Sequence, residues 1–408
     1  MAYGFIERFK APYTTITFGG TQAITKVNSF LPYNYGVAYS GATTLGDYAV
    51  FGGGKTGSSD SGTINTVIAI NGDGSWVRLP NMHTSRYYLA AATAQSVNQS
   101  AEGDAALFAG GRDYQGNNLD TIEVYYQNFM HDESTLRLPN AVHALAGASF
   151  GQYAIFAGGQ GNNTKPVSAA AFSADWTRTI LSDLSSPGSL ISAACNSNYA
   201  IFAGGYSDSG ISSSVTAYDS TLAKATSPSP PSLSSGRVAI PSGTAGDYAL
   251  FVGGEISGGV TNVAEAYDKN LNKVTASNYT WVVRAAATTS LGSYLLIMGG
   301  MGNSNYYNIV RYYDSNLVLH ETGPLFHLSK DGAAASAGEY AYFYGGHQGN
   351  SYWGEFDVYH LPNKVTVYPG TKYKLGSMAN EVTASSMQTI TTEAPISGYI
   401  KIKNANLP

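Results

Sequence analysis

A seven-fold internal repeat is the feature that most constrains what this chain can fold into. An apolar run that ends in two glycines occurs seven times, and its second glycines, 46 to 57 residues apart, are Gly54, Gly111, Gly159, Gly205, Gly254, Gly300 and Gly346. Self-similarity at this period is typical of solenoids and propellers, in which each unit buries its apolar faces against its neighbours. One repetitive domain therefore accounts for most of the 408 residues.

Each repeat carries the landmarks of four antiparallel strands. A run of small residues, such as Ala90–Thr93, precedes the apolar run and predicts an innermost strand, where lateral room is small. An aromatic residue marks a third strand 13 residues after the second glycine in five repeats (Phe172, Tyr218, Tyr267, Tyr313 and Tyr359), and an Asp- or Asn-containing turn leads to a fourth strand in three of them. The apolar runs are apolar at consecutive positions, as expected where both faces of a sheet are covered. Together these landmarks predict an all-β, seven-bladed β-propeller.

The order of apolar strand, Gly-Gly pair and later tyrosine resembles the kelch repeat, and the resemblance covers residues 31 to 368. It implies a propeller of four-stranded, kelch-like blades. The tryptophan of the kelch motif is missing from most copies, and only Trp176 lies near its place. Some kelch-like propellers are enzymes, among them copper oxidases of the galactose oxidase type and a sialic acid mutarotase. The copper site of that family needs a cysteine cross-linked to a tyrosine, and Cys195 is badly placed to supply it.

Both ends of the chain extend beyond the repeats. Residues 1–30 are predicted to form an N-terminal arm with a possible closing or edge strand, and residues 369–408 a C-terminal extension in which 387–392 and 397–403 form a β-hairpin. Residues 23–30 and 364–368 compete for the outer strand of the last blade. We favour the second segment, because Asn363–Thr366 resembles Asn272–Thr275 at the same place in an earlier repeat. A lone hairpin is marginally stable, so we expect the ends to dock on the propeller or on other structural proteins.

Composition excludes several classes of function. The net charge is −5 and no basic cluster exists, so we expect no nucleic-acid partner. A single cysteine excludes an intrachain disulfide framework and a thiolate metal cluster. We predict synthesis without a signal peptide and no membrane insertion, because the first ten residues lack an apolar core and no apolar run approaches about 18 residues. We predict no cofactor and no metal site, and we name no catalytic residue.

One face of the propeller is the predicted binding face. The loops that follow each Gly-Gly pair and the loops that cross between blades emerge on the same side, because neighbouring strands of a blade alternate in direction, and these loops differ strongly between repeats. Their aromatic rings and polar groups suit sugars, although tyrosine-rich loops are also typical of protein-binding surfaces. The predicted ligand-binding residues are Tyr33, Tyr35, His83, Arg86, Tyr87, Arg112, Tyr114, His143, Tyr206, Arg237, Glu255, Trp281, Arg284, Tyr306, His327, His347 and Trp353.

Two functions follow as hypotheses. The first is a non-enzymatic binding or structural propeller, displayed on a larger assembly such as a phage virion or tail, that recognises a host-surface glycan or protein. Its low charge and its Gly, Ser, Thr, Asn and Tyr content are similar to those of phage tail proteins. The alternative is a sugar-modifying enzyme, mutarotase- or lyase-like, in which Glu255, His347, Arg112 and Arg237 supply acid and base groups at the mouth. An intracellular interaction adaptor is a weaker third possibility.

Overall fold

The computed structural model describes residues 35–361, apart from residues 73, 98–102 and the side chains of 133–134. Beyond this range it describes the backbone of residues 16–17, 25–30, 363–367, 371–374, 382–383, 388–392 and 401–404. In the described part of the chain there is no α-helix, and the one short helix is a 3-10 turn, η1 (Asp60–Gly62). Accordingly, no helix long and apolar enough to cross a membrane occurs among these residues.

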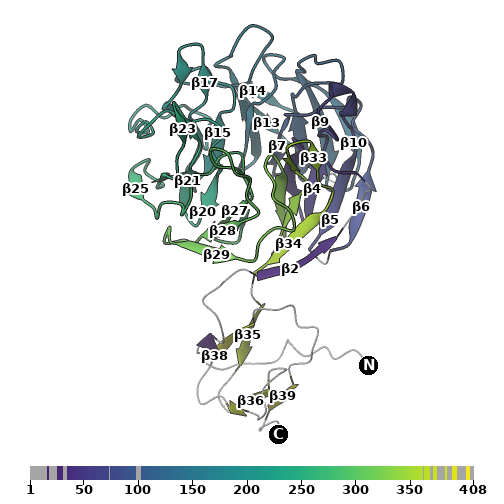
Figure 1. The fold of residues 1–408 in the computed structure, drawn as a ribbon, viewed down its shortest axis with the longest axis vertical. Helices are drawn as coiled ribbons and strands as arrows, with labels where there is room; N and C mark the ends of the chain where they lie inside the picture. The colour runs from purple at the N-terminus through teal and green to yellow at the C-terminus, as the bar shows by residue number, and fades with distance from the viewer. Residues whose placement is uncertain are drawn as a thin grey trace. The chain divides into compact units, whose positions relative to one another are not determined.

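Seven antiparallel sheets are arranged radially around a centre, as the all-β propeller prediction required (Figure 1). The first three blades are β3 (Gly41–Leu45), β4 (Tyr48–Gly52), β5 (Val67–Asn71) and β6 (Trp76–Leu79); β7 (Ala90–Ala94), β8 (Ala105–Ala109), β9 (Thr121–Tyr126) and β10 (His131–Arg137); and β11 (Ala146–Phe150), β12 (Tyr153–Ala157), β13 (Ala169–Ser173) and β14 (Arg178–Ile180). The fourth is β15 (Ser192–Cys195), β16 (Tyr199–Ala203) and β19 (Val215–Asp219). The fifth and sixth are β20 (Ser242–Ala245), β21 (Tyr248–Val252), β24 (Ala264–Tyr267) and β25 (Lys273–Thr275); and β26 (Ala287–Leu291), β27 (Tyr294–Met298), β28 (Val310–Tyr313) and β29 (Leu319–Thr322).

The seventh blade is closed by the N-terminal part of the chain. Its strands are β30 (Ala333–Ala337), β31 (Tyr340–Tyr344), β34 (Phe356–His360) and, outermost, β2 (Thr25–Phe30), which lies beside β34 in Figure 1. Our preference for the C-terminal segment was therefore wrong: β35 (Asn363–Val367) pairs with β38 (Gln388–Thr392) instead. The resemblance to Asn272–Thr275 reflected strand-forming residues, which do not determine the partner strand.

The fourth blade has three strands where four were expected. After β19 only an isolated bridge between Tyr218 and Lys224 stands in the place of a fourth strand. Pro228, Pro230 and Pro231 follow closely. Proline has no N–H group to donate to a neighbouring strand, so this segment cannot continue the sheet.

The apolar core is divided among the seams between blades. Bulky residues of one blade pack on the next; for example, Val50 and Leu79 of the first blade contact Phe108 and Tyr125 of the second. The tyrosines of the third strands also fix the crossing loop that precedes their blade. In the second blade, for example, the hydroxyl of Tyr125 donates to the carbonyl of Pro80 over 2.9 Å. The inner strands hold the small residues that the sequence predicted, and they contact one another around the ring, β30 contacting β3.

The Gly-Gly pairs join each blade to the next. All fourteen of these glycines have a positive φ, between 64° and 111°. The N–H of Gly346 donates to the carbonyl of Val37 over 2.7 Å, and a Cβ on Gly345 would lie 2.1 Å from that same oxygen. The pairs are structural bends, as predicted, and the close approach of the neighbouring blade explains why two glycines are required.

A second compact unit comprises residues 1–27 and 359–408. It contains two three-stranded sheets, one of β1 (Ile16–Thr17), β38 and β35, and one of β37 (Val382–Thr383), β36 (Thr371–Lys374) and β39 (Lys401–Asn404). The predicted C-terminal hairpin is therefore wrong: its two segments form strands, but β38 pairs with β35 and β39 pairs with β36. Alternating β-branched residues predict a strand without specifying its register or its partner.

Candidate functional site

A closed circle of seven backbone hydrogen bonds surrounds one mouth of the propeller. One residue of each blade belongs to it, and each N–H donates to the carbonyl of the preceding residue of the circle over 2.8 to 3.2 Å. The seven residues are Tyr39, Tyr88, Ala144, Leu190, Ala239, Ala285 and Asp331. All seven have left-handed backbone conformations, with φ between 49° and 61°, which are uncommon for residues other than glycine. We call this set the mouth circle.

The loops that were predicted to share a face meet at the mouth circle. In every blade the residue that follows the Gly-Gly pair forms a backbone bridge with the residue that precedes the circle, as in Tyr87 with Arg112 and Lys330 with His347. The prediction of a common loop face is thus confirmed. Short ribbons extend three of these loops: β17 (Tyr206–Ser207) with β18 (Gly210–Ile211), β22 (Glu255–Ile256) with β23 (Gly259–Val260), and β32 (His347–Gln348) with β33 (Ser351–Tyr352).

The side chains of the mouth circle are distributed unevenly. Asp331, Tyr39 and Tyr88 belong to the consecutive blades seven, one and two, whereas the other four blades contribute only alanine and leucine. None of the seven residues is fully buried. The mouth therefore has an aromatic and acidic sector opposite a sector of aliphatic side chains, most of them small.

His347 connects the members of the aromatic sector. Its Nε2 lies 2.8 Å from the Tyr39 hydroxyl and 3.2 Å from Oδ2 of Asp331, and its ring stacks on Tyr352 with centroids 5.2 Å apart. Its Nδ1 lies 2.9 Å from the carbonyl of Gly349. Because a carbonyl only accepts, Nδ1 carries a proton. In the neutral ring Nε2 accepts from the Tyr39 hydroxyl, and in the imidazolium form Nε2 donates to Oδ2 of Asp331 instead.

The tyrosines of this sector stay protonated over the physiological range. Burial, followed by the charge of Asp331, raises the pKa of Tyr39 far above its usual value, and the same two causes raise the pKa of Tyr88. The two rings lie 4.3 Å apart. The sector therefore offers hydroxyl groups, one carboxylate and an imidazole beside aromatic faces.

A second group of charges adjoins the aromatic sector. The Tyr87 hydroxyl donates to Oδ1 of Asp60 over 2.9 Å, and Nζ of Lys55 lies 2.7 Å from the same oxygen and 4.5 Å from the centre of the Tyr87 ring. Hydrogen bonds from Lys55 and Tyr87 lower the pKa of Asp60, so this side chain is an anion at neutral pH. Arg112 donates to the carbonyl of Gly116 within its own loop.

Several predicted site residues lie around this sector or elsewhere on the loop face. Tyr87, Arg112, His347 and Tyr306, whose ring centre is 6.4 Å from that of His347, are near the aromatic sector. Glu255 and Arg284 pair with each other at 2.6 Å, and Nδ1 of His143 donates to Oδ1 of Asn118 over 2.8 Å. His327 stacks on Trp353 at 3.8 Å. Four of the predicted residues, Tyr35, Tyr114, Tyr206 and Trp281, are exposed aromatic residues, and the side chain of His83 is half exposed. Tyr33 lies outside the described residues.

Arg86 and Arg237 require a correction, because both are completely buried. Nη1 of Arg237 donates to the carbonyls of Gly253 and Val263, and its Nη2 pairs with Glu265. Arg86 makes the equivalent contacts in the second blade, with the carbonyls of Gly110 and Thr121 and with Glu123. Because both side chains are used to stabilise a Gly-Gly bend inside the protein, we remove them from the candidate site.

Sequence reasoning missed Tyr39, Tyr88, Asp331 and Tyr352. The first three occupy one column of the repeat, shortly before the small-residue inner strand. In six repeats this column lies 15 residues before the second glycine, whereas Tyr88 lies 23 residues before Gly111, so the second repeat carries an insertion of eight residues. Alignment that allows for this insertion would have displayed the column, with two tyrosines and an aspartate among alanines and leucine. The circle itself carries no sequence signal, since its members differ in chemistry.

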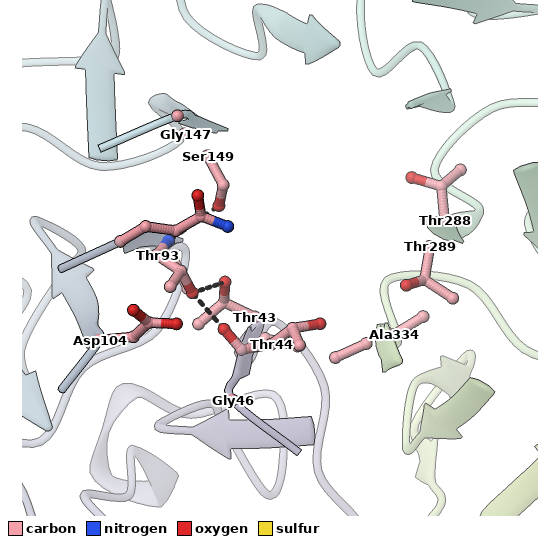
Figure 2. Close-up of a pocket in the computed structure, with 15 residues that line it drawn as sticks. Thr43, Thr44, Gly46, Thr93, Asp104, Gly147, Ser149, Thr288, Thr289 and Ala334 are labelled. Atoms are coloured by element: carbon pink, nitrogen blue, oxygen red, sulfur yellow. Dashed lines mark hydrogen bonds between the residues drawn. The ribbon is translucent and has the colours of Figure 1, made fainter. Parts of the chain in front are cut away.

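The channel behind the mouth is lined by hydroxyl groups. A cavity of about 380 Å³ is bordered by Thr43, Thr93, Ser149, Thr288 and other mostly small residues of the inner strands and their turns, together with Gln95 and Asp104. Figure 2 shows the labelled side chains around an open centre. Oγ1 of Thr43 lies 2.8 Å from Oγ1 of Thr93, and Oγ1 of Thr44 donates to the carbonyl of Ser336 over 2.8 Å. These hydroxyls join inner strands of neighbouring blades, so we assign them to the frame.

A closed circle of seven antiparallel sheets with one face of variable loops defines the class of this chain: it is a seven-bladed β-propeller of kelch-like architecture. Among solved structures it is similar to the one titled "Structure of YjhT", with a TM-score of 0.53 and 11% sequence identity over 71% of this chain and 98% of that chain. At this identity the likeness concerns the fold alone. No protein-family model matches the sequence, and no curated protein matches it.

Proposed function

We propose that this propeller is a binding protein whose mouth recognises a carbohydrate. The observation that carries the proposal is the uneven mouth circle, in which Tyr39, Tyr88 and Asp331 face a sector of aliphatic residues. A sugar ring stacks on an aromatic face, and its hydroxyl groups bond to a carboxylate, an imidazole and phenols. The aliphatic sector leaves room for the ligand opposite those groups.

The binding propeller acts on the surface of a larger assembly, such as a phage virion or tail, and the ligand is a host-surface glycan. The second unit supports this part of the proposal. It unites segments from both ends of the chain in two sheets of its own, and none of the strands in those sheets belongs to a blade. We propose that this unit attaches the propeller to other structural proteins.

A sugar-modifying enzyme is the second candidate, and one observation favours it. Asp331, His347 and Tyr39 are joined through the same imidazole nitrogen, at 3.2 and 2.8 Å. Such a chain of groups is able to move a proton to or from a sugar hydroxyl, which is the requirement for a mutarotase- or lyase-like reaction.

A glycan array with the purified full-length chain tests the first candidate. We expect binding to a restricted set of glycans and to host bacterial cells. In the variant Tyr88→Ala, affinity should fall about tenfold or more, which corresponds to the loss of one well-packed aromatic contact. Leu190→Ala is the matched control, because it truncates the circle on the opposite side and should leave affinity unchanged.

Turnover measurements separate the two candidates. If nuclear magnetic resonance detects accelerated anomer exchange or cleavage of a sugar, and His347→Gln abolishes it while binding persists, the enzyme is established. If neither glycans nor cells are bound and no sugar is turned over, the mouth is not a carbohydrate site.

A further inference from the structure

Two histidines and a glutamate converge in the seam between the first and second blades. Nδ1 of His83 lies 3.1 Å from Oε2 of Glu123, and Nε2 of His131 lies 2.9 Å from the same oxygen. The three ligand-type atoms lie within 4.8 Å of one another. The Glu123 side chain is completely buried, His131 is nearly so, and half of the His83 side chain is exposed.

The strands of the second blade place two of these groups. Glu123 and Tyr125 are two residues apart on β9 and so lie on one face of the sheet, and His131 is directly opposite Tyr125 on β10. The rings of Tyr125 and His131 stack with centroids 4.3 Å apart. His83 comes from the crossing loop, which Tyr125 fixes through the carbonyl of Pro80.

The two carboxylate oxygens of Glu123 have different partners. Oε1 accepts from Arg86 over 2.9 Å and from the backbone N–H of Thr84 over 3.2 Å. Oε2 lies on the side of the two imidazoles, His83 and His131. Arg86 thus fixes the orientation of the carboxylate and leaves Oε2 directed at both histidines.

The fifth blade contains the same buried pair without histidines. There Arg237 binds Glu265, Lys273 stands opposite Tyr267 just as His131 stands opposite Tyr125, and Ser234 donates to the glutamate. A lysine and a serine are thus sufficient to stabilise the arginine–glutamate pair. The two imidazoles of the second blade are not required for that structural task.

We propose that His83, His131 and Glu123 bind a divalent transition-metal ion, with Zn²⁺ as the best fit. Zinc takes two imidazole nitrogens and one carboxylate oxygen at about 2.0 to 2.2 Å in a tetrahedral arrangement, which places the ligand atoms about 3.3 Å apart. The two nitrogen–oxygen distances are a few tenths of an ångström shorter than this. The His83 side chain is half exposed, so its ring has room to adjust to the metal, and a water molecule would complete the coordination from the solvent side.

The metal ion would tie a loop of the candidate site to the second blade. The crossing loop that carries His83 continues within five residues to Tyr87 and Tyr88 of the mouth. Because the site lies in the seam and shares no residue with the mouth, the inference does not depend on the proposed carbohydrate ligand. The sequence alone predicted no metal site, since the three residues are separated by 40 and 8 positions and follow no ligand-spacing motif.

Titration of the full-length, chelator-stripped chain with ZnCl₂ in a calorimeter tests the proposal. We expect one ion per chain and a dissociation constant of about 10 μM or lower. His83→Ala removes an exposed ligand and should weaken binding at least about tenfold. The double variant His83→Ser/His131→Lys copies the fifth blade, should abolish binding, and should keep the melting temperature measured in chelator. His143→Gln removes a histidine elsewhere and should bind Zn²⁺ as the unaltered chain does.

Cobalt substitution gives a second readout. Co²⁺ in a tetrahedral site of two nitrogens and an oxygen absorbs visible light, and these bands should be absent from the double variant. The proposal is overturned if the unaltered chain shows no saturable Zn²⁺ binding, or if the double variant binds Zn²⁺ as tightly. If the unaltered chain binds Co²⁺ but shows only the weak bands of octahedral coordination by oxygen, the two histidines are not ligands and the proposal is equally overturned.

Discussion

Two glycines of the seventh blade allow the role of the blade seam to be measured. Gly345 and Gly338 both have left-handed backbones, with φ of 70° and 56°. A Cβ on Gly338 would meet nothing within 4 Å, whereas a Cβ on Gly345 would lie 2.1 Å from the carbonyl oxygen of Val37 in the first blade. The substitutions Gly338→Ala and Gly345→Ala therefore impose the same kind of backbone strain and differ in contact with the neighbouring blade.

The expected costs follow from these contacts. An alanine in the left-handed conformation destabilises the folded state by about 1 to 2 kcal/mol. Alanine also lowers the conformational entropy of the unfolded chain, which stabilises the protein by about 0.4 to 1 kcal/mol. Gly338→Ala should therefore lower the free energy of unfolding by about 1 kcal/mol. Gly345→Ala adds overpacking, at about 1 to 3 kcal/mol. It also displaces the carbonyl that accepts from Gly346 over 2.7 Å, which adds about 1 to 3 kcal/mol if the buried groups lose their bond. The total for Gly345→Ala is about 3 to 7 kcal/mol.

Urea unfolding of both variants measures the difference between their free energies of unfolding. Equal slopes of the two transitions would show that both variants expose the same surface on unfolding. The free energy of unfolding should be lower in Gly345→Ala than in Gly338→Ala by at least about 2 kcal/mol. Equal losses in the two variants would refute the reasoning, because positive φ alone would then explain the Gly-Gly motif and the seam would contribute nothing.

Three further perturbations test the buried charges and their pH dependence. Arg237→Leu should destabilise by about 3 to 5 kcal/mol in urea unfolding, because Glu265 keeps only the partly exposed Lys273 as its ionic partner and the carbonyls of Gly253 and Val263 lose their donor; a loss below about 1 kcal/mol would contradict this. Burial, and then the charge of Arg112, lowers the pKa of His143 to about 4 from 6.5, so the unfolded chain takes up a proton first as pH falls. Stability should therefore drop by up to about 3 kcal/mol between pH 6.5 and 4, and His143→Gln should remove that part of the slope. The pKa of Glu123 is about 2 in the folded protein and 4.5 in the unfolded chain, so the ionised carboxylate stabilises the fold above pH 4.5 and this stabilisation is lost as the pH falls toward 2. Glu123→Gln should cost about 3 kcal/mol at pH 7, and the cost should shrink in that acid range.

The repeat determined most of the fold because its signals are local and occur seven times. Small residues on the inner strand, Gly-Gly at the seam and a tyrosine on the third strand each have one physical role, as Gly345 and Tyr125 illustrate. Ring closure could not be predicted in the same way. It depends on which of two similar strands reaches the free edge of β34, and β2 and β35 differ too little in strand-forming residues to decide this.

The candidate site was only partly predictable. The loop face followed from strand direction, but burial within that face did not, so Arg86 and Arg237 were included although both bind the neighbouring blade. Tyr39 is 308 residues away from His347 and Asp331 only 16, so ring closure is what brings Tyr39 to the other two. The convergence of His83 and Glu123 likewise depends on how one blade packs on the next.

The mouth circle also has an electrostatic consequence. Its seven peptide groups donate in one rotational sense, each to its neighbour, so their dipoles lie along the circumference and cancel around the closed path. The end of an α-helix, in contrast, aligns its peptide groups with its axis and attracts anions. These seven peptide groups thus favour neither sign of charge at the centre of the circle. The choice between acidic, basic and neutral ligands rests with side chains such as Asp331 and Lys330, and one substitution on the circle is able to change it without disturbing the frame.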